Sequence, residues 1–124
     1  MHKDWVEIAE SFMGRPYVWG GVSSKGLDCS GLVQTALRAF GQDAPRDSDQ
    51  QSLLGKAVSI SNDLAGLNRG DLIFWKGHVG VMSSPSELIH SNAWHMMVAR
   101  EPLKTAVKRM GEKSGPITAI RRLS

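Results

Sequence analysis

The 124-residue chain contains one cysteine, Cys29, and therefore cannot form an internal disulfide. A fold that does not depend on oxidation suits a reducing compartment. The chain also lacks an apolar run long enough to span a bilayer, and its first residues, MHKDWVEIAESFMG, carry acids where a signal peptide needs an apolar core. These absences predict no membrane insertion. We expect a cytoplasmic protein if the chain is taken as written, and a periplasmic or secreted one if it is a fragment of a longer precursor.

An excess of charge is also lacking. The chain has 15 Lys and Arg against 12 Asp and Glu, a net charge of +3. The densest basic stretch, residues 104–122, has no interleaved aromatic residues, so we do not expect a nucleic-acid partner. With 41% hydrophobic and 22% charged residues, the composition is that of an ordinary globular domain. We therefore expect one domain over residues 1–124, and the sequence leaves its oligomeric state open.

Helical patterns come before strand patterns along the chain. Apolar residues recur at helical spacing in residues 3–13 and 29–40, and Phe40 belongs to the second apolar stripe. Residues 22–28 are expected to form a loop. The remaining elements are a short helix at 45–54, strands at 72–75, 78–82, 88–91, 96–99 and 117–121, and a helix at 102–110. This order predicts an α+β domain with N-terminal helices packed on a mainly antiparallel sheet.

The single thiol lies at a position that favours chemistry. Asp28 is a natural N-cap, which makes Cys29 the first residue of its helix. The helix dipole and the free N–H groups there favour a thiolate, which is the nucleophilic form. Gly26 and Gly31 would leave room for a substrate backbone. The alternative is that Cys29 is a small buried hydrophobe, as lone cysteines often are.

A thiol enzyme also needs a base, and the candidates are histidines. If residues 83–85 form a three-residue hairpin loop, Met82 pairs with Ser86 and His78 lies opposite His90 on one sheet face. One imidazole would then take the thiol proton while the other orients it.

Two other histidines are weaker candidates. His95 is the rival to His90 for the orienting role, and His2 lies at a terminus that is expected to fray. Zinc bound by Cys29, His90 and His95 is an alternative, but no recognisable metal-ligand spacing supports it. We expect neither a metal nor another cofactor.

Four motifs occur in the order PYVWGG, LDCSGLV, APRDSDQQ and GDLIFWKGHVGVM. Together they resemble the NlpC/P60 cysteine peptidases, over about residues 9–100. The resemblance implies a compact papain-like fold and hydrolysis of bacterial cell-wall peptides, often at the γ-D-glutamyl–meso-diaminopimelate bond. Many members carry an N-terminal SH3-like domain that is not recognisable here, so the chain is either a catalytic domain by itself or a fragment of a longer protein.

The resemblance also implies roles for individual residues. Cys29 matches the family's nucleophile, His78 its histidine and His90 its polar third residue. Tyr17 would lie over the active site and, with the backbone N–H of Cys29, hold the oxyanion or the substrate. A further set would bind the free amino end of an L-alanyl-γ-D-glutamyl unit: Asp28, Ser30 and Ser48.

Each of these binding residues also has a purely structural interpretation. Asp28 and Ser48 would also serve as helix caps, and Tyr17 as a packed ring. Arg46 would either pair with a substrate carboxylate or brace its loop. Trp19, Trp75, Trp94, Met96 and Met97 are expected to be core or groove-lining residues.

The predicted function is therefore a cysteine endopeptidase acting on a peptidoglycan stem peptide or muropeptide. Two alternatives remain open. The same three residues would serve an N-acetylmuramoyl-L-alanine amidase or an acyltransferase. A catalytically silent domain that binds wall peptides or a protein is the other alternative.

Overall fold

A computed structural model describes residues 4–18, 21–23, 26–92 and 94–123 of the chain. The predictions for His2 and Trp19 concern residues outside these ranges. The helices and strands follow in the order α1 (Trp5–Ser11), β1 (Val22–Ser23), β2 (Gly26–Leu27), α2 (Cys29–Ala39), α3 (Ser48–Gln51), β3 (Lys56–Ala57), β4 (Leu72–Trp75), β5 (His78–Met82), β6 (Glu87–Asn92), β7 (Met97–Pro102), α4 (Leu103–Lys113) and β8 (Ala119–Arg122).

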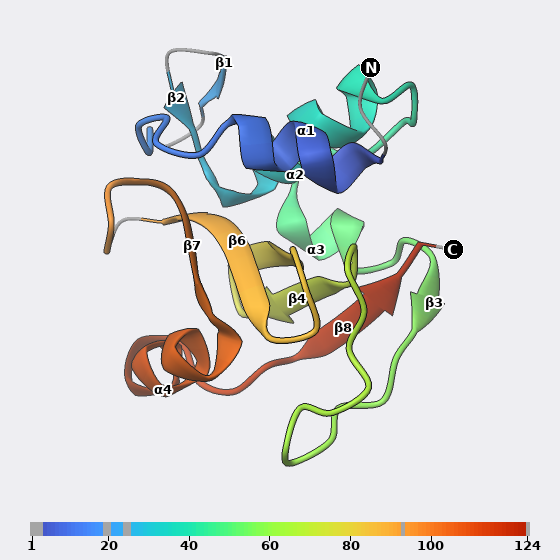
Figure 1. The fold of residues 1–124 in the computed structure, drawn as a ribbon, viewed down its shortest axis with the longest axis vertical. Helices are drawn as coiled ribbons and strands as arrows, with labels where there is room; N and C mark the ends of the chain where they lie inside the picture. Colours follow the sequence, from blue (N-terminus) through green and yellow to red (C-terminus); the bar gives the residue numbers. More distant parts are fainter. Residues whose placement is uncertain (1–3, 19–20, 24–25, 93, 124) are drawn as a thin grey trace.

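The centre of the fold is a six-stranded sheet with the order β3-β8-β4-β5-β6-β7. Every neighbouring pair of these strands is antiparallel. Helices α1 and α2 lie together on one side of the sheet, and α4 lies on the opposite side (Figure 1). The predicted α+β class with helices on an antiparallel sheet is confirmed.

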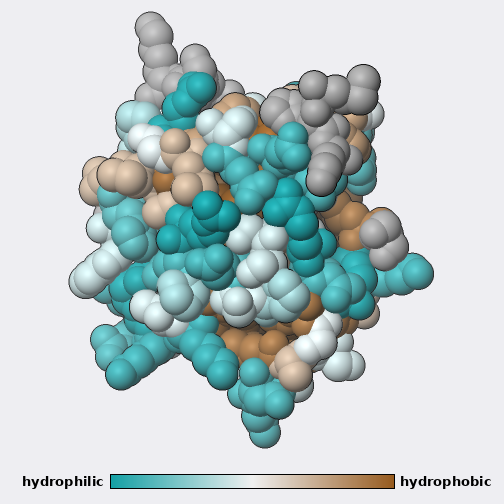
Figure 2. Space-filling view, in the orientation of Figure 1, coloured by the Kyte–Doolittle hydropathy of each residue, from teal (hydrophilic) through white to brown (hydrophobic). Residues whose placement is uncertain are grey.

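Alternation along the strands divides the apolar interior into two clusters. In β4, Leu72 and Phe74 pack in the cluster that contains the apolar residues of α1 and α2. Ile73 and Trp75 face the other way and pack with Leu103 of α4. The surface in Figure 2 is accordingly mostly hydrophilic, with hydrophobic residues visible in limited areas. The sheet therefore has one face under α1 and α2 and another under α4.

Helix α2 begins and ends as its sequence predicts. Asp28 is the N-cap, and its side chain accepts a hydrogen bond from the Gly31 N–H. Gly41, just beyond the helix, has a φ of +90°, which suits glycine at a C-terminal stop. The residues that form the buried stripe are Leu32, Val33, Ala36 and Leu37. Phe40 was wrongly predicted to belong to this stripe: it caps the helix with 45% of its surface exposed.

The register of the β5–β6 hairpin differs from the prediction by two residues. Met82 pairs with Leu88 and not with Ser86, because Ser83 still bonds across the turn to Glu87. Side chains alternate with a period of two along a strand, so a shift of two residues keeps each side chain on its predicted face. His78 and His90 therefore remain on one face, but diagonally placed rather than directly opposite.

Glycine in β5 makes room for this diagonal contact. A Cβ atom on Gly80 would lie 2.7 Å from Leu88 Cδ1 and 3.1 Å from His90 Cβ. His90 therefore lies beside a residue without a side chain, and its ring has space to reach toward His78.

Three smaller expectations also need correction. Residues 22–28, predicted as a loop, contain the two-stranded hairpin β1–β2. The predicted helix at 45–54 is reduced to the four residues of α3, and the edge strand β3 was not predicted. None of the helices in the described residues is long and apolar enough to cross a membrane.

Candidate active site

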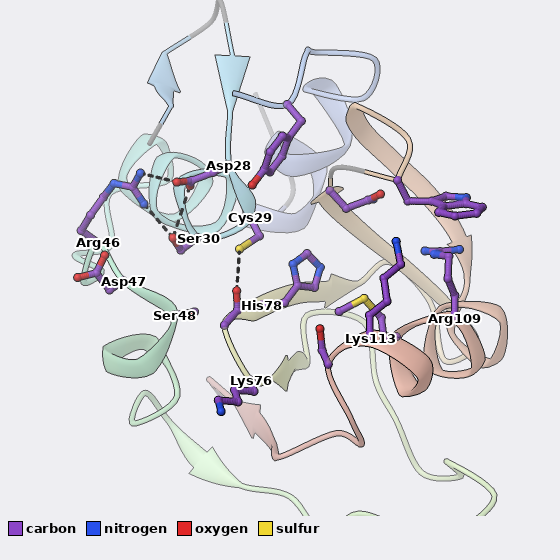
Figure 3. Close-up of a pocket in the computed structure, with 16 residues that line it drawn as sticks. Asp28, Cys29, Ser30, Arg46, Asp47, Ser48, Lys76, His78, Arg109 and Lys113 are labelled. Atoms are coloured by element: carbon purple, nitrogen blue, oxygen red, sulfur yellow. Dashed lines mark hydrogen bonds and ion pairs between the residues drawn. The ribbon is translucent and has the colours of Figure 1, made fainter. Parts of the chain in front are cut away.

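A cleft of about 550 Å³ lies where the N-terminus of α2, the turn before β5 and the helix α4 meet. Cys29 and His78 both line it. Figure 3 shows the Cys29 sulfur and the His78 side chain in the middle, with Asp28 and Arg46 on one side and Lys113 on the other. Cys29 is the first residue of α2, and His78 the first of β5, so the ends of two elements bring them together.

The Cys29 thiol is accessible from the cleft but half-buried. Its sulfur donates a long hydrogen bond, 3.9 Å, to the carbonyl oxygen of Gly77. Burial raises the pKa of the Cys29 thiol, and the backbone N–H groups of Val79, Ser30 and Cys29 oppose this only in part. The prediction that the helix terminus ionises this sulfur is therefore wrong for the resting protein, because the cost of burying the charge outweighs the helix terminus.

The two predicted imidazoles are in contact. His78 Nε2 lies 2.7 Å from His90 Nδ1, and His90 is completely buried. Burial, together with the neighbouring His90 and Arg109, lowers the pKa of His78 to about 3. Burial likewise lowers the pKa of His90, although Glu101 acts in the opposite direction. Both rings are thus neutral near pH 7.

Two functional candidates escaped the sequence analysis, Glu101 of β7 and Arg109 of α4. His90 Nε2 lies 2.5 Å from Glu101 Oε2, and Arg109 donates to both oxygens of Glu101 at 2.5 and 2.8 Å. Burial raises the pKa of Glu101, but hydrogen bonds from Arg109 and His90 outweigh it and hold the pKa at about 2. An ionised carboxylate therefore stands behind the two histidines.

His95 is not the partner of His78. Its ring bonds to Asn92 Oδ1 at 3.0 Å and stays 4.0 Å from Glu101 Oε2. The ligand atoms of His90, His95 and Glu101 lie within 4.8 Å of one another, which is close enough to hold a metal ion. Arg109, however, already occupies both carboxylate oxygens, and a guanidinium repels a cation. We interpret this group as a hydrogen-bonded network.

Asp28, Ser30 and Arg46 form one wall of the cleft. Asp28 Oδ2 accepts a hydrogen bond from Arg46 Nη2 at 2.8 Å, and Arg46 Nη1 donates to Ser30 Oγ at 2.8 Å. Of the two interpretations of Arg46, the structure therefore supports bracing of its own loop. Asp28 combines this ion pair with its role as N-cap.

Three further residues complete this side. Tyr17, Asp47 and Ser48 line the cleft. Burial, and the nearby Cys29 and Asp28, raise the pKa of Tyr17, so its hydroxyl remains protonated. Ser48 is not the cap of α3: Asp47 occupies that position, and its side chain makes no capping hydrogen bond. Asp47 is thus an exposed carboxylate that the sequence analysis did not single out.

The opposite wall is cationic. It contains Trp94, Arg109 and Lys113, and Lys76 lies at the turn between β4 and β5. Lys113 Nζ and the Arg109 guanidinium each lie 5.3 Å from the centre of the Trp94 ring. Within the described residues no carboxylate forms an ion pair with Lys76 or Lys113. Their positive charges are available to a ligand.

The structure corrects four expectations for residues near the cleft. Gly26 and Gly31 give space to the chain and not to a substrate: a Cβ atom on Gly31 would lie 2.3 Å from the Gly21 carbonyl oxygen. Met96 and Met97 are exposed and do not line the cleft. Trp94 does line it, and Trp75 lies in the core.

Sequence comparison relates the chain to known proteins. The chain matches the NlpC/P60 family over residues 14–110. It is 35% identical over 97 residues to a γ-D-glutamyl-L-lysine dipeptidyl-peptidase of Bacillus subtilis, a match that covers 72% of this chain and 31% of that protein. It is 38% identical over 110 residues to the protein of the same name from Bacillus cereus, covering 82% and 32%.

Solved structures share the fold. An NlpC/P60 family protein from Bacillus cereus superposes with a TM-score of 0.79 at 34% identity, covering 97% of this chain and 39% of that chain. The peptidoglycan hydrolase RipB from Mycobacterium tuberculosis gives a TM-score of 0.77 at 28% identity, covering 96% and 62%. The chain belongs to the NlpC/P60 family. It spans about a third of the length of its two Bacillus relatives, whose names agree with the predicted peptidase class.

Proposed function

We propose that the protein is a cysteine endopeptidase of bacterial cell-wall peptides, with Cys29 as nucleophile, His78 as general base and His90 as the residue that orients His78. One observation carries this proposal. A free thiol at a helix N-terminus shares a cleft with a neutral imidazole whose Nε2 is hydrogen-bonded to a second imidazole. Thiol, base and orienting group are the parts that nucleophilic acyl transfer requires.

The reaction would start from a neutral pair. His78 accepts the thiol proton as the sulfur attacks the scissile carbonyl carbon, which creates the thiolate only when it is used. The C–N bond then breaks, and His78 returns the proton to the leaving amine. Water hydrolyses the remaining thioester with the same imidazole as base. The backbone N–H of Cys29 and the hydroxyl of Tyr17 are the proposed oxyanion donors.

The acyl side of the substrate would be an L-alanyl-γ-D-glutamyl unit. Its free ammonium group would bind near Asp28, Ser30 and Ser48, as expected from the resemblance. Since Arg46 neutralises Asp28, the exposed carboxylate of Asp47 is the further candidate for holding the positive charge.

On the leaving side we propose meso-diaminopimelate rather than lysine. The two amino acids differ by one carboxylate at the end of the side chain. Lys76 and Lys113 lack ion-pair partners among the described residues, and they would complement this extra negative charge. The names of the two Bacillus relatives support cleavage after γ-D-glutamate.

The test is release of diaminopimelate from L-Ala-γ-D-Glu-meso-diaminopimelate. Cys29→Ala should lower the rate by more than about 1,000-fold, since removal of the nucleophile from such a group of residues is nearly as damaging as removal of all of them. Wild-type protein alkylated at Cys29 should behave like the variant. Equal release by both proteins, or none by the wild type, would contradict the proposal. Release of whole stem peptides from intact sacculi would favour the amidase alternative.

A further inference from the structure

An unbroken chain of hydrogen bonds runs from His78 through buried His90 and Glu101 to Arg109, and both of its ends line the cleft. It joins His78, His90, Glu101 and Arg109, with contacts of 2.7 Å between the rings, 2.5 Å from His90 to Glu101 and 2.5 and 2.8 Å from Arg109 to Glu101. The four side chains come from four successive elements, β5, β6, β7 and α4. His78, His90 and Glu101 are each at least nine-tenths buried, so bulk water does not compete for these bonds.

The chain has a direction, because the Arg109 end carries a fixed charge. Arg109 cannot lose its protons and donates to both oxygens of Glu101, which keeps this carboxyl ionised and able only to accept. The proton between Glu101 and His90 must therefore reside on His90 Nε2. In a neutral His90 ring, Nδ1 is then the acceptor.

The same reasoning determines the tautomer of His78. Its Nε2 faces the acceptor Nδ1 of His90, so Nε2 must carry the proton. The lone pair of a neutral His78 ring is then on Nδ1, the nitrogen not engaged by His90. We propose that Glu101, held by Arg109, is a positioning residue that fixes the tautomers of His90 and His78, and so leaves Nδ1 of His78 free to take the Cys29 proton. The catalytic meaning of this assignment rests on the function proposed above, whereas the tautomers themselves do not.

An amide in place of the Glu101 carboxylate should reverse the direction of donation along this series of hydrogen bonds. In Glu101→Gln, Arg109 would hold the amide oxygen and direct the NH2 group at His90 Nε2. His90 would then carry its proton on Nδ1 and donate to His78 Nε2, which forces the His78 proton onto Nδ1. We expect kcat to fall by roughly 100- to 10,000-fold with KM changed less than about threefold, as for the wrong-tautomer variant of a serine-protease triad.

The decisive measurement is the ¹⁵N chemical shift of the histidine ring nitrogens. It is recorded on Cys29→Ala protein, in which no thiol proton can move to the ring. We expect Nε2–H on both His78 and His90, and Nδ1–H on His90 after addition of Glu101→Gln. Glu87→Gln, the same substitution on β6 outside the cleft, should leave the wild-type pattern. A proton on Nδ1 of His78 with Glu101 intact would overturn the proposal even if Glu101→Gln does not fold.

A second readout uses the native thiol and no peptide substrate. Because Cys29 is the single cysteine, iodoacetamide reports on it alone. Glu101→Gln should slow alkylation at pH 7 by at least about tenfold, since the thiol loses its base. Unchanged tautomers and an unchanged alkylation rate in a folded Glu101→Gln protein would refute the positioning role. If murein peptides are not cleaved while both readouts behave as expected, the proposed substrate fails and the assignment of Glu101 stands.

Discussion

Burial controls the charges of the proposed nucleophile, Cys29, and the proposed base, His78. It raises the pKa of the Cys29 thiol and lowers that of the His78 imidazole to about 3, so each favours its neutral form in the resting protein. A neutral imidazole has a lone pair that can accept a proton, and a neutral thiol is protected from random oxidation, which attacks the thiolate. In the proposed mechanism the imidazole is therefore neutral before substrate binds, and the thiolate forms only during the reaction.

Lys113 gives a prediction for substrate selection. Lys113→Met keeps a long side chain beside Trp94 but removes the charge. Loss of one partly exposed charge contact costs about 1 kcal/mol, so kcat/KM for L-Ala-γ-D-Glu-meso-diaminopimelate should fall roughly five- to tenfold. The rate for L-Ala-γ-D-Glu-L-Lys, which lacks the carboxylate, should stay within about twofold.

The matched control for this experiment is Lys108→Met, on the same helix but outside the cleft. It should leave both substrates unaffected. Equal losses on the two substrates in Lys113→Met would show that Lys113 does not distinguish the carboxylate.

The site residues that the sequence identified are those whose immediate sequence neighbours mark them as candidates. Cys29 follows a cap at a helix start, and His78 opens a strand after a tight turn. Glu101 required longer-range information. His90 pairs with Ala99, so Glu101, two residues further along β7, lies on the same sheet face. Without the β6–β7 register, nothing in the sequence near Glu101 connects it to the site.

At the scale of elements, close backbone approach at the N-terminus of α2 determines where the thiol lies. Gly31 lies against the Gly21 carbonyl and the Asp28 side chain, with no room for a methyl group. The sequence predicted the helix and its cap from local residues. It could not predict which segment packs against the helix, because the contact joins Gly31 of α2 to Gly21, just before β1, and their spacing carries no periodic signal.

Gly31→Ala tests this close approach. A Cβ atom would lie 2.3 Å from a backbone oxygen, which cannot move like a side chain. We expect the free energy of unfolding to fall by about 1–3 kcal/mol, measured by urea denaturation, together with slower alkylation of Cys29. Gly111→Ala in α4 is the matched helical control, because nothing lies within 4 Å of its Cβ position. It should stabilise the protein by about 0.5–1 kcal/mol, and a similar loss in both variants would exclude the steric explanation.

The molecule as a whole assembles its site from both sides of one sheet. Cys29 comes from the side of α1 and α2, and Arg109 and Lys113 come from α4 on the other side. The fold class and five of the strands were predictable, because apolar alternation and turn residues mark them locally. The pairing order β3-β8-β4-β5-β6-β7 depends on contacts between distant segments, and the sequence alone does not encode it in any local pattern.

This architecture should make the protein sensitive to acid. In the unfolded chain, histidine takes up a proton around pH 6.5 and glutamate around pH 4.5. In the folded protein the pKa of His78 is about 3 and that of Glu101 about 2. The unfolded state therefore binds more protons across this window, so stability is greatest above it and declines as the pH falls. The steepest loss due to His78 is roughly 1.4 kcal/mol per pH unit.

Urea unfolding of the wild type and of His78→Gln at pH 7, 5.5 and 4 checks this expectation. The variant should lose less stability than the wild type between pH 5.5 and 4, since one titrating group is gone. If the free energy of unfolding changes with pH by the same amount in both proteins, His78 is not a buried neutral residue.

Helix α4 follows β7 without a single intervening residue, and the Leu103 N–H is bonded to the Ser86 carbonyl. Because α4 is joined to the sheet without a linker, it has no hinge about which it could close over a bound peptide. Discrimination on that side must then come from side-chain identity rather than from movement. Exchanging the few α4 side chains that face the cleft would give this scaffold a new preference without any redesign of its backbone.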